Sequence, residues 1–212
     1  MNKMILYTVP GSCGFASHVA LEMSGAEYEA RLAPREGGKT APSFYEINPK
    51  GRVPALVTSD GILTETPAIL FFIAQTHQDA KLAPFSDAWR IARLQSFCAY
   101  MCATVHVAHA HGHRGYRWAT EESSFKDMTQ KVPANMTECF ELIESEMLEG
   151  PWVLGDTFSL GDIYLLAIAR WLEADKVDTS KIPRVLEHRL RMLELPAVAR
   201  AVQMEKELVT TA

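Results

Sequence analysis

The pattern of apolar residues changes about a third of the way along the chain, and this change limits the folds that the chain can adopt. Up to residue 78, short apolar runs bounded by Pro and Gly alternate with helical segments; after residue 88, apolar residues recur only at helical spacing. The pattern predicts an α/β domain at 1–78, a linker at 79–88 and an all-helical domain at 89–212. A chain of 212 residues is long enough for two such domains.

The first domain is predicted to alternate strands and helices. Residues 4–9 form an apolar run that stops at Pro10-Gly11, as a buried strand does. The pair Asp60-Gly61 between two apolar runs predicts a β-hairpin in which both residues adopt positive φ. The other expected segments are a helix from Gly14 that stops at Gly25, a strand at 28–32, a loop at 34–43 and a helix at 67–77.

The second domain is expected to be helical throughout, with prolines at several of the breaks. Ser159 and Asp162 stand three residues apart at one helix start, the spacing of a capping box in which each side chain accepts a hydrogen bond from the other residue's backbone. This motif is either a well-formed helix start or a feature with a special role in folding. The expected helices are 89–110, 121–148, 160–174, 184–193 and 196–208.

Composition excludes several classes of function. The 21 Lys and Arg against 26 Asp and Glu give a net charge of −5, which argues against nucleic-acid binding. No apolar run approaches the roughly 18 residues that a membrane-spanning helix needs. The four cysteines, at 13, 98, 102 and 139, form no CxxC pair, so reduced thiols and a cytoplasmic location are expected. Cys98, Cys102 and Cys139 are interpreted as packing residues.

The segment Pro10-Gly11-Ser12-Cys13-Gly14 joins the first expected strand to the first helix. Backbone amides at a helix N-terminus carry partial positive charge and stabilise a thiolate, either that of Cys13 or that of a bound thiol ligand. The Ser12 hydroxyl is placed to donate to the same sulfur. The alternative is that Cys13 is a small core residue and that Ser12 only caps the helix.

Two further segments carry possible binding groups. If the Val53-Pro54 bond is cis, the preceding backbone is turned outward, free to pair with a peptide-like ligand. In Glu65-Thr66-Pro67, a Thr66 cap and the first helix amides suit a carboxylate, and Glu65 suits an ammonium group. Each of these signals is weak alone, since most Val-Pro bonds are trans and a capping Thr is common.

These motifs in this order resemble the cytosolic glutathione transferases over nearly the whole chain, with PGSC most similar to the bacterial beta class. The resemblance implies a thioredoxin-like α/β N-terminal domain, an all-α C-terminal domain, a homodimer, and glutathione as co-substrate with no other cofactor. The supporting segments are VPGSCGFASHVAL at 9–21, INPKGRVPAL at 47–56, LTETPAI at 63–69 and GDTFSLGDIYLL at 155–166.

The resemblance also implies roles for individual residues. It places Cys13 next to the glutathione sulfur, with Ser12 as second candidate and Tyr7 as third. It pairs the Val53 backbone with the cysteinyl part of glutathione and makes Pro54 the cis-proline. Its remaining binding residues are Glu65 and Thr66 at the γ-glutamyl end, Lys39 at the other end and Arg52 beside the site.

The electrophile pocket is expected to include Tyr7, Tyr100, His106 and His109. His106, His109 and His113 share one helical face, whereas His111 lies off it. Pocket or dimer-cleft lining, surface packing and a metal site are the alternatives, and the absence of an HExxH glutamate or paired Cys ligands argues against metal. The Asn and the His-Lys pair of the beta-like pattern are replaced here by Tyr100, Val107 and Ala108.

The expected reaction is activation of the glutathione thiol for conjugation to small hydrophobic electrophiles. Thiol-disulfide exchange or peroxidase chemistry through Cys13 is a related possibility. Two rival hypotheses stay open at this point: a non-catalytic binding module of the same fold, and a glutathione-dependent oxidoreductase.

Overall fold

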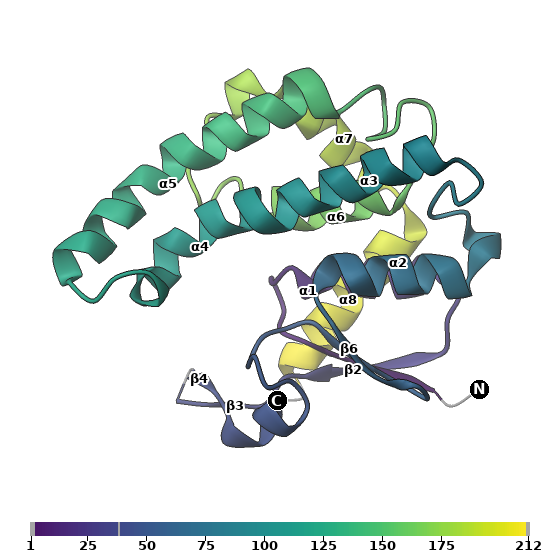
Figure 1. Ribbon diagram of the computed structural model, residues 1–212, viewed down its shortest axis with the longest axis horizontal. Coiled ribbons are helices and arrows are strands. Elements are labelled where there is room, and N and C mark those ends of the chain that lie inside the picture. Colours follow the sequence, from purple (N-terminus) through teal and green to yellow (C-terminus); the bar gives the residue numbers. More distant parts are fainter. Residues whose placement is uncertain (1–2, 38, 211–212) are drawn as a thin grey trace. The chain divides into compact units, whose positions relative to one another are not determined.

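The structure is a computed structural model in which residues 3–37 and 39–210 are described (Figure 1). It divides into two compact units, one formed by Met1–Ser86 with Leu193–Ala212 and the other by Asp87–Met192. The division after Ser86 falls inside the segment predicted as a linker. The helix at the end of the described chain groups with the first unit, although in sequence it follows the helices of the second.

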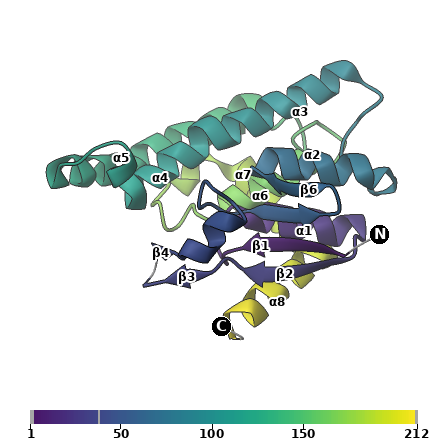
Figure 2. The same cartoon turned by 60° about the horizontal axis from the view of Figure 1, so that its bottom comes forward.

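The first unit is built on a mixed sheet of order β2-β1-β5-β6 (Figure 2). β1 pairs in parallel with β2 and antiparallel with β5, and β5 pairs antiparallel with β6. The helices of this unit are α1, α2 and α8, and α1 packs against β1, α2 and α8. The bounds are β1 Met4–Thr8, α1 Gly14–Ser24, β2 Tyr28–Leu32, β5 Ala55–Thr58, β6 Gly61–Thr64, α2 Thr66–Thr76 and α8 Pro196–Thr210.

Helix α1 lies inside its unit rather than on the surface. Every residue from Gly14 to Leu21 is buried, because the sheet and two other helices surround it. Most of these buried residues are apolar, as a buried helix requires, although Ser17 and His18 are also fully buried. Gly25 ends the helix with φ 67°, as its position after the last apolar residue predicted.

Two local predictions in the first unit were wrong. The segment expected as a loop at 34–43 contains a short hairpin, β3 Arg35–Glu36 with β4 Lys39–Thr40. In the β5–β6 hairpin, Thr58 pairs with Gly61, so the turn residues are Ser59 and Asp60. Positive φ occurs at Gly61 but not at Asp60. The Thr58 hydroxyl accepts from the Asp60 amide, which stabilises this turn without a left-handed Asp.

The second unit is helical, as predicted. Two isolated β-bridges, Trp152–Gly155 and Leu154–Thr157, lie in the loop before α6. Residues 89–110 are one helical stretch interrupted by a π-helical turn at Met101–Val105, and a second π-helical turn at Ile143–Met147 follows α5. The helices are α3 Ala88–Tyr100, α4 His106–Arg114, α5 Glu122–Leu142, α6 Leu160–Ala169 and α7 Pro183–Leu193. None of the described helices is both long and apolar enough to cross a membrane.

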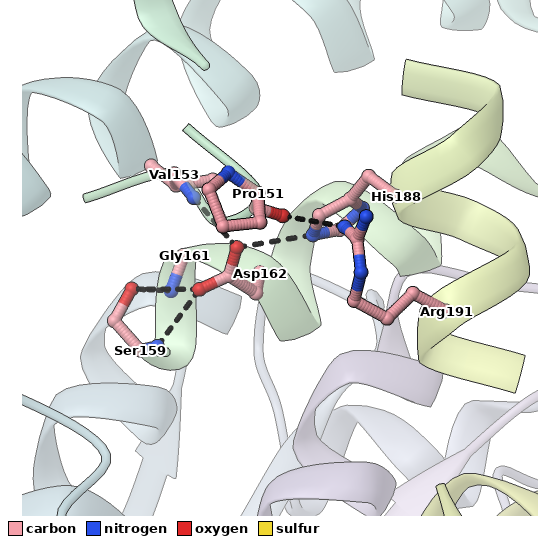
Figure 3. A network of polar contacts seen from close by, with 7 residues as sticks. All are labelled: Pro151, Val153, Ser159, Gly161, Asp162, His188 and Arg191. Carbon is pink, nitrogen blue, oxygen red and sulfur yellow. Dashed lines mark hydrogen bonds and ion pairs between the residues drawn. The ribbon is translucent and has the colours of Figure 1, made fainter. Parts of the chain in front are cut away.

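The start of α6 confirms the predicted capping box and extends it (Figure 3). Asp162 is fully buried and accepts from the backbone amides of Ser159, at 2.8 Å, and Val153, at 2.7 Å. His188 Nε2 from α7 lies 3.0 Å from Asp162 Oδ1. A carboxylate removed from water is tolerated only when donors surround it in this way. The motif therefore joins α6, α7 and the preceding loop.

Candidate active site

The loop from Pro10 to Gly14 leads from β1 into α1. Ser12 N–H donates to Val9 O at 3.0 Å, which closes a tight turn. Cys13 is the N-cap residue of α1, and no side chain caps the helix at that position. The Ser12 hydroxyl accepts from the Gly14 amide at 3.2 Å. Because the hydroxyl acts there as an acceptor, its proton stays available for a further partner.

Glycine is required at the first residue of α1. A Cβ on Gly14 would lie 2.3 Å from Thr8 Oγ1 and 3.1 Å from Ser12 Oγ. Thr8 is fully buried on β1, and no hydrogen bond of its hydroxyl is found in the described part of the chain. The close approach of β1 to the helix start therefore depends on residue 14 having no side chain.

Cys13 and Val53 are brought together from segments far apart in sequence. Cys13 is buried, with 6% exposure, and its Sγ lies 3.7 Å from Val53 O, to which the thiol donates. The Val53-Pro54 peptide bond is cis, as the sequence analysis considered. Val53 also packs on a small apolar cluster that contains Phe44 and Ala55. The structure thus places the predicted sulfur residue beside the predicted peptide-binding strand.

The loop before Val53 is held from within. Asn48 is buried, and its Nδ2 donates to Arg52 O at 2.5 Å, while its Oδ1 accepts from the Lys50 amide at 3.1 Å. The Arg52 side chain itself is exposed. Lys39 is also exposed, on β4. Neither side chain makes a contact in the described structure that assigns it a role.

At the start of α2, one detail of the sequence interpretation was wrong. Thr66 was expected to cap the helix, but it is the first helical residue, and Glu65 is the N-cap residue with φ 75°. This left-handed backbone is rare for a residue with a side chain, and such strain is typical of functional sites. Thr66 is 4% exposed, and its hydroxyl makes no hydrogen bond within the described residues.

Glu65 has a partner that the sequence analysis did not assign. Lys50 Nζ donates to the Glu65 carboxylate and, at 2.6 Å, to Thr64 Oγ1. Both charged side chains are well exposed, at 47% for Lys50 and 64% for Glu65. An exposed pair of this kind contributes about 0–1 kcal/mol and is readily exchanged for another partner. Lys50 lies in the segment INPKGRVPAL at 47–56, and its positive charge was the one feature in the sequence that could have suggested a pair with Glu65.

Tyr7 lies on the face of β1 opposite Leu6 and Thr8, as strand alternation requires. Its ring packs against Phe44 with centroids 5.8 Å apart. Hydrogen bonds with Glu29 and with Tyr7 raise the pKa of Arg31 above its usual range. Tyr7 is therefore engaged with Phe44 and Arg31 in the first unit.

The other three predicted pocket residues belong to the second unit. Tyr100 OH donates to Cys139 O at 3.4 Å, and burial, together with contacts to Cys139, raises the pKa of Tyr100. His106 and His109 follow the π-helical turn, and both rings contact Trp171. Their centroids lie 6.3 Å apart, which confirms that they share a face.

His109 is held by both a stacked ring and a carboxylate. Its ring stacks on Trp171 at 3.9 Å with an interplanar angle of 15°, and its Nδ1 lies 2.7 Å from Asp175 Oδ2. His113 continues the same face at 6.4 Å from His109, whereas His111 turns away to Trp118. Within the described residues, no group of three or more His, Cys, Asp or Glu side chains is arranged to hold a metal ion.

A mixed sheet of order β2-β1-β5-β6, with a cysteine at the start of α1 and a cis-proline just before β5, defines a thioredoxin-like domain, followed here by a helical domain. Family comparisons agree with this class. Residues 2–75 match the glutathione S-transferase N-terminal domain, and residues 129–200 match a glutathione S-transferase C-terminal domain.

Individual relatives extend the match to almost the full chain. A glutathione transferase homologue from Sulfitobacter, solved with bound glutathione, is 40% identical with a TM-score of 0.92, covering 96% of this chain and 99% of its own. A beta-class transferase from Sphingomonas chungbukensis is 30% identical with a TM-score of 0.81, covering 95% and 98%. The chain belongs to the glutathione S-transferase family.

Curated relatives are more distant and carry two kinds of name. Glutathione S-transferase GstA from Escherichia coli O157:H7 is 26% identical over 206 residues, 95% of this chain and 98% of its own length. A maleylacetoacetate isomerase from Pseudomonas aeruginosa is 27% identical over 170 residues, 77% of this chain and 78% of its own length. Both names therefore occur among the curated relatives of this chain.

Proposed function

We propose that this transferase activates the thiol of glutathione at the Ser12–Cys13 loop and conjugates it to small hydrophobic electrophiles. The observation that carries the proposal is the approach of Cys13 Sγ to Val53 O, at 3.7 Å. It brings the start of α1 next to the Val53–Pro54 segment that leads into β5, so that a peptide paired with the Val53 backbone would present its sulfur to the helix start. The likeness of the PGSC segment to the bacterial beta class, and the 30% identity to the beta-class transferase from Sphingomonas chungbukensis, support assignment to that class.

The sulfur would be stabilised as a thiolate by two kinds of group. The backbone dipoles at the start of α1 give this helix end a partial positive charge, which favours a negative sulfur. Cys13 is the first candidate for direct contact with that sulfur. Ser12 is the second, because its hydroxyl already accepts from the Gly14 amide and keeps its proton to donate.

The remainder of glutathione would be held along the same edge of the first unit. The backbone of Val53, next to Pro54, would pair with the cysteinyl residue. The first amides of α2 and the Thr66 hydroxyl suit the γ-glutamyl carboxylate, and Glu65 suits its ammonium group. When glutathione binds, its ammonium would replace Lys50 as the partner of Glu65. Lys39 and Arg52 are proposed for the opposite end of the tripeptide.

The electrophile is assigned to the second domain together with Tyr7. Tyr100, His106 and His109 are the proposed lining residues, with Trp171 as the aromatic wall that both histidines contact. We further propose that the protein works as a cytoplasmic homodimer. Glutathione is its co-substrate, and no other cofactor is required.

The direct test compares Cys13→Ala and Ser12→Ala with the unchanged protein. Conjugation of a chromogenic aryl halide is followed against pH, together with the ultraviolet absorbance of bound glutathione thiolate. Removal of the contacting group should lower kcat/KM by about 10²-fold and move the thiol titration to higher pH. If both variants keep wild-type conjugation and titration, the loop does not contact the sulfur.

A second activity is favoured by Cys13, which forms no disulfide in the described part of the chain. The Cys13 thiolate would attack a glutathione mixed disulfide, form a Cys13–glutathione disulfide and release the other thiol; a second glutathione thiolate would then regenerate Cys13 and leave as glutathione disulfide. Mass spectrometry detects the Cys13 adduct directly. Disulfide reduction that exceeds conjugation and is lost in Cys13→Ala would make this the main activity.

A further inference from the structure

Helix α8 reaches the loop that carries Ser12 and Cys13. Glu205 on α8 accepts a hydrogen bond from the Gly11 backbone amide, with Oε1 at 3.2 Å from the nitrogen, across 194 residues of sequence. Gly11 stands one residue before Ser12 and two before Cys13, and has φ 78°. A distant helix of the same unit therefore supplies an acceptor for the backbone of the thiol loop.

The carboxylate of Glu205 is an unusual group at such a place. Glu205 is 5% exposed, and a carboxylate removed from water costs free energy unless donors compensate it. A buried Glu on a helix that otherwise packs through Ala197, Val198 and Ala201 is not needed for core packing. The backbone amide of the thiol loop is one donor that compensates for the burial.

Helix α8 is itself fixed firmly enough to act as a support. Arg200 Nε lies 2.7 Å from Glu22 Oε2 on α1. Tyr28 OH, on β2, donates to the same carboxylate at 2.6 Å and lies 3.5 Å from Met204 Sδ. These contacts, with the packing of α8 on α1, fix the helix that carries the Glu205 acceptor.

We propose that Glu205 is a positioning residue for the thiol reaction, which holds the Gly11 amide and thereby sets the place of the Ser12 and Cys13 side chains. The role requires an acceptor at this point, which an uncharged carbonyl oxygen also supplies. The inference rests on the proposed sulfur contacts of Ser12 and Cys13.

Two substitutions separate acceptor from charge. Glu205→Gln keeps a carbonyl oxygen for Gly11 and removes the charge, whereas Glu205→Ala removes both. Displacement of a catalytic group by about 1 Å can cost about 10²-fold, so Glu205→Ala should lower kcat/KM for an aryl halide by at least about tenfold. It should also move the titration of bound glutathione to higher pH. Glu205→Gln should restore both quantities to within about twofold of wild type.

The matched control is Arg200→Ala on the same helix. It removes the ion pair with Glu22 and loosens α8, but it leaves the Glu205–Gly11 hydrogen bond in place. This variant should lower Tm and keep the wild-type pH profile. An equal change of pH profile in Arg200→Ala and Glu205→Ala would assign the effect to general loosening and would overturn the proposal.

A measurement without glutathione keeps the inference separate from the proposed function. Amide hydrogen exchange of a peptide spanning 10–14 should be faster in Glu205→Ala than in the wild type, Glu205→Gln or Arg200→Ala. Unchanged exchange in Glu205→Ala would refute the anchoring of the loop, whatever the activity. The proposed function can also fail by itself. If exchange is faster in Glu205→Ala but the wild-type protein neither binds nor turns over glutathione, the proposed function is refuted and the anchoring of the loop stands.

Discussion

Helix α6 in the second unit and helices α1 and α2 in the first unit differ in how their N-termini are capped. At the start of α6, a fully buried Asp162 binds two backbone amides, and Ser159 binds a third. At the starts of α1 and α2, the N-cap residues Cys13 and Glu65 provide no side-chain cap. The amides at a helix start need acceptors, and side chains supply them at α6. The comparison separates a helix start capped by buried side chains from two whose N-cap side chains accept no hydrogen bond from the helix.

The largest effect is expected at the closed helix start. Asp162→Ala would leave the Val153 and Ser159 amides and His188 Nε2 without their acceptor inside the core, at a cost of about 3–5 kcal/mol in the free energy of unfolding. Urea titration followed by circular dichroism measures it. Asp156→Ala, at an exposed carboxylate of the same loop, is the control. A loss below about 1 kcal/mol would show that the network does not hold α6 and α7 together.

The next largest effect is expected where the start of α1 approaches Thr8 on β1. Gly14→Ala would push a methyl group against Thr8 Oγ1 and should cost about 1–3 kcal/mol. Thr8→Ala makes room, so the double variant should recover part of the loss in a double-mutant cycle. If the stability losses of Gly14→Ala and Thr8→Ala simply add in the double variant, the helix start shifts to accept the methyl group. In that case its position is not fixed by contact with β1.

A matched pair of cap substitutions tests the comparison most directly. Ser159→Ala removes a hydroxyl that accepts from the Gly161 amide and should cost about 1 kcal/mol of stability. Thr66→Ala removes a hydroxyl without a partner in the described structure and should change stability by less than about 0.5 kcal/mol, while weakening glutathione binding in calorimetry. The reverse ranking in stability would mean that α2 is capped by Thr66 after all.

The smallest effect is a dependence on pH at the contact between α1 and α8. Burial raises the pKa of Glu22, but hydrogen bonds from Tyr28 and Arg200 outweigh it and lower the pKa below its ordinary value of 4.5. A carboxyl with a lowered pKa in the folded state stabilises the protein above pH 4.5 and loses this stabilisation as pH falls through the folded value.

Glu22→Gln should therefore flatten the stability curve of the protein on the acidic side of pH 4.5, by about 0.5 kcal/mol and less at high salt. Thermal unfolding followed between pH 3 and pH 6, in steps of about half a unit, resolves the change. The same slope in wild type and Glu22→Gln would place the acid sensitivity elsewhere.

What the sequence could predict depends on how local the cause is. The capping box needs only Ser159 and Asp162, three residues apart, and the stop of α1 needs only Gly25, so both were predicted. The positive φ at Glu65 was missed because it follows from how β6 enters α2, and it moved the N-cap from Thr66 to Glu65. The pairs Lys50–Glu65 and Gly11–Glu205 were missed because no periodicity links residues that meet only in the folded chain.

The return of α8 to the first unit has a consequence for how the protein is made. Synthesis runs from the N-terminus at about 5–20 residues per second, and domains fold as they emerge. The thiol loop leaves the ribosome long before its distant contact, since 194 residues separate Gly11 from Glu205. During translation the sheet can form around a loop that lacks this support. The nascent chain therefore carries the Cys13 loop without its Glu205 contact until α8 has been synthesised.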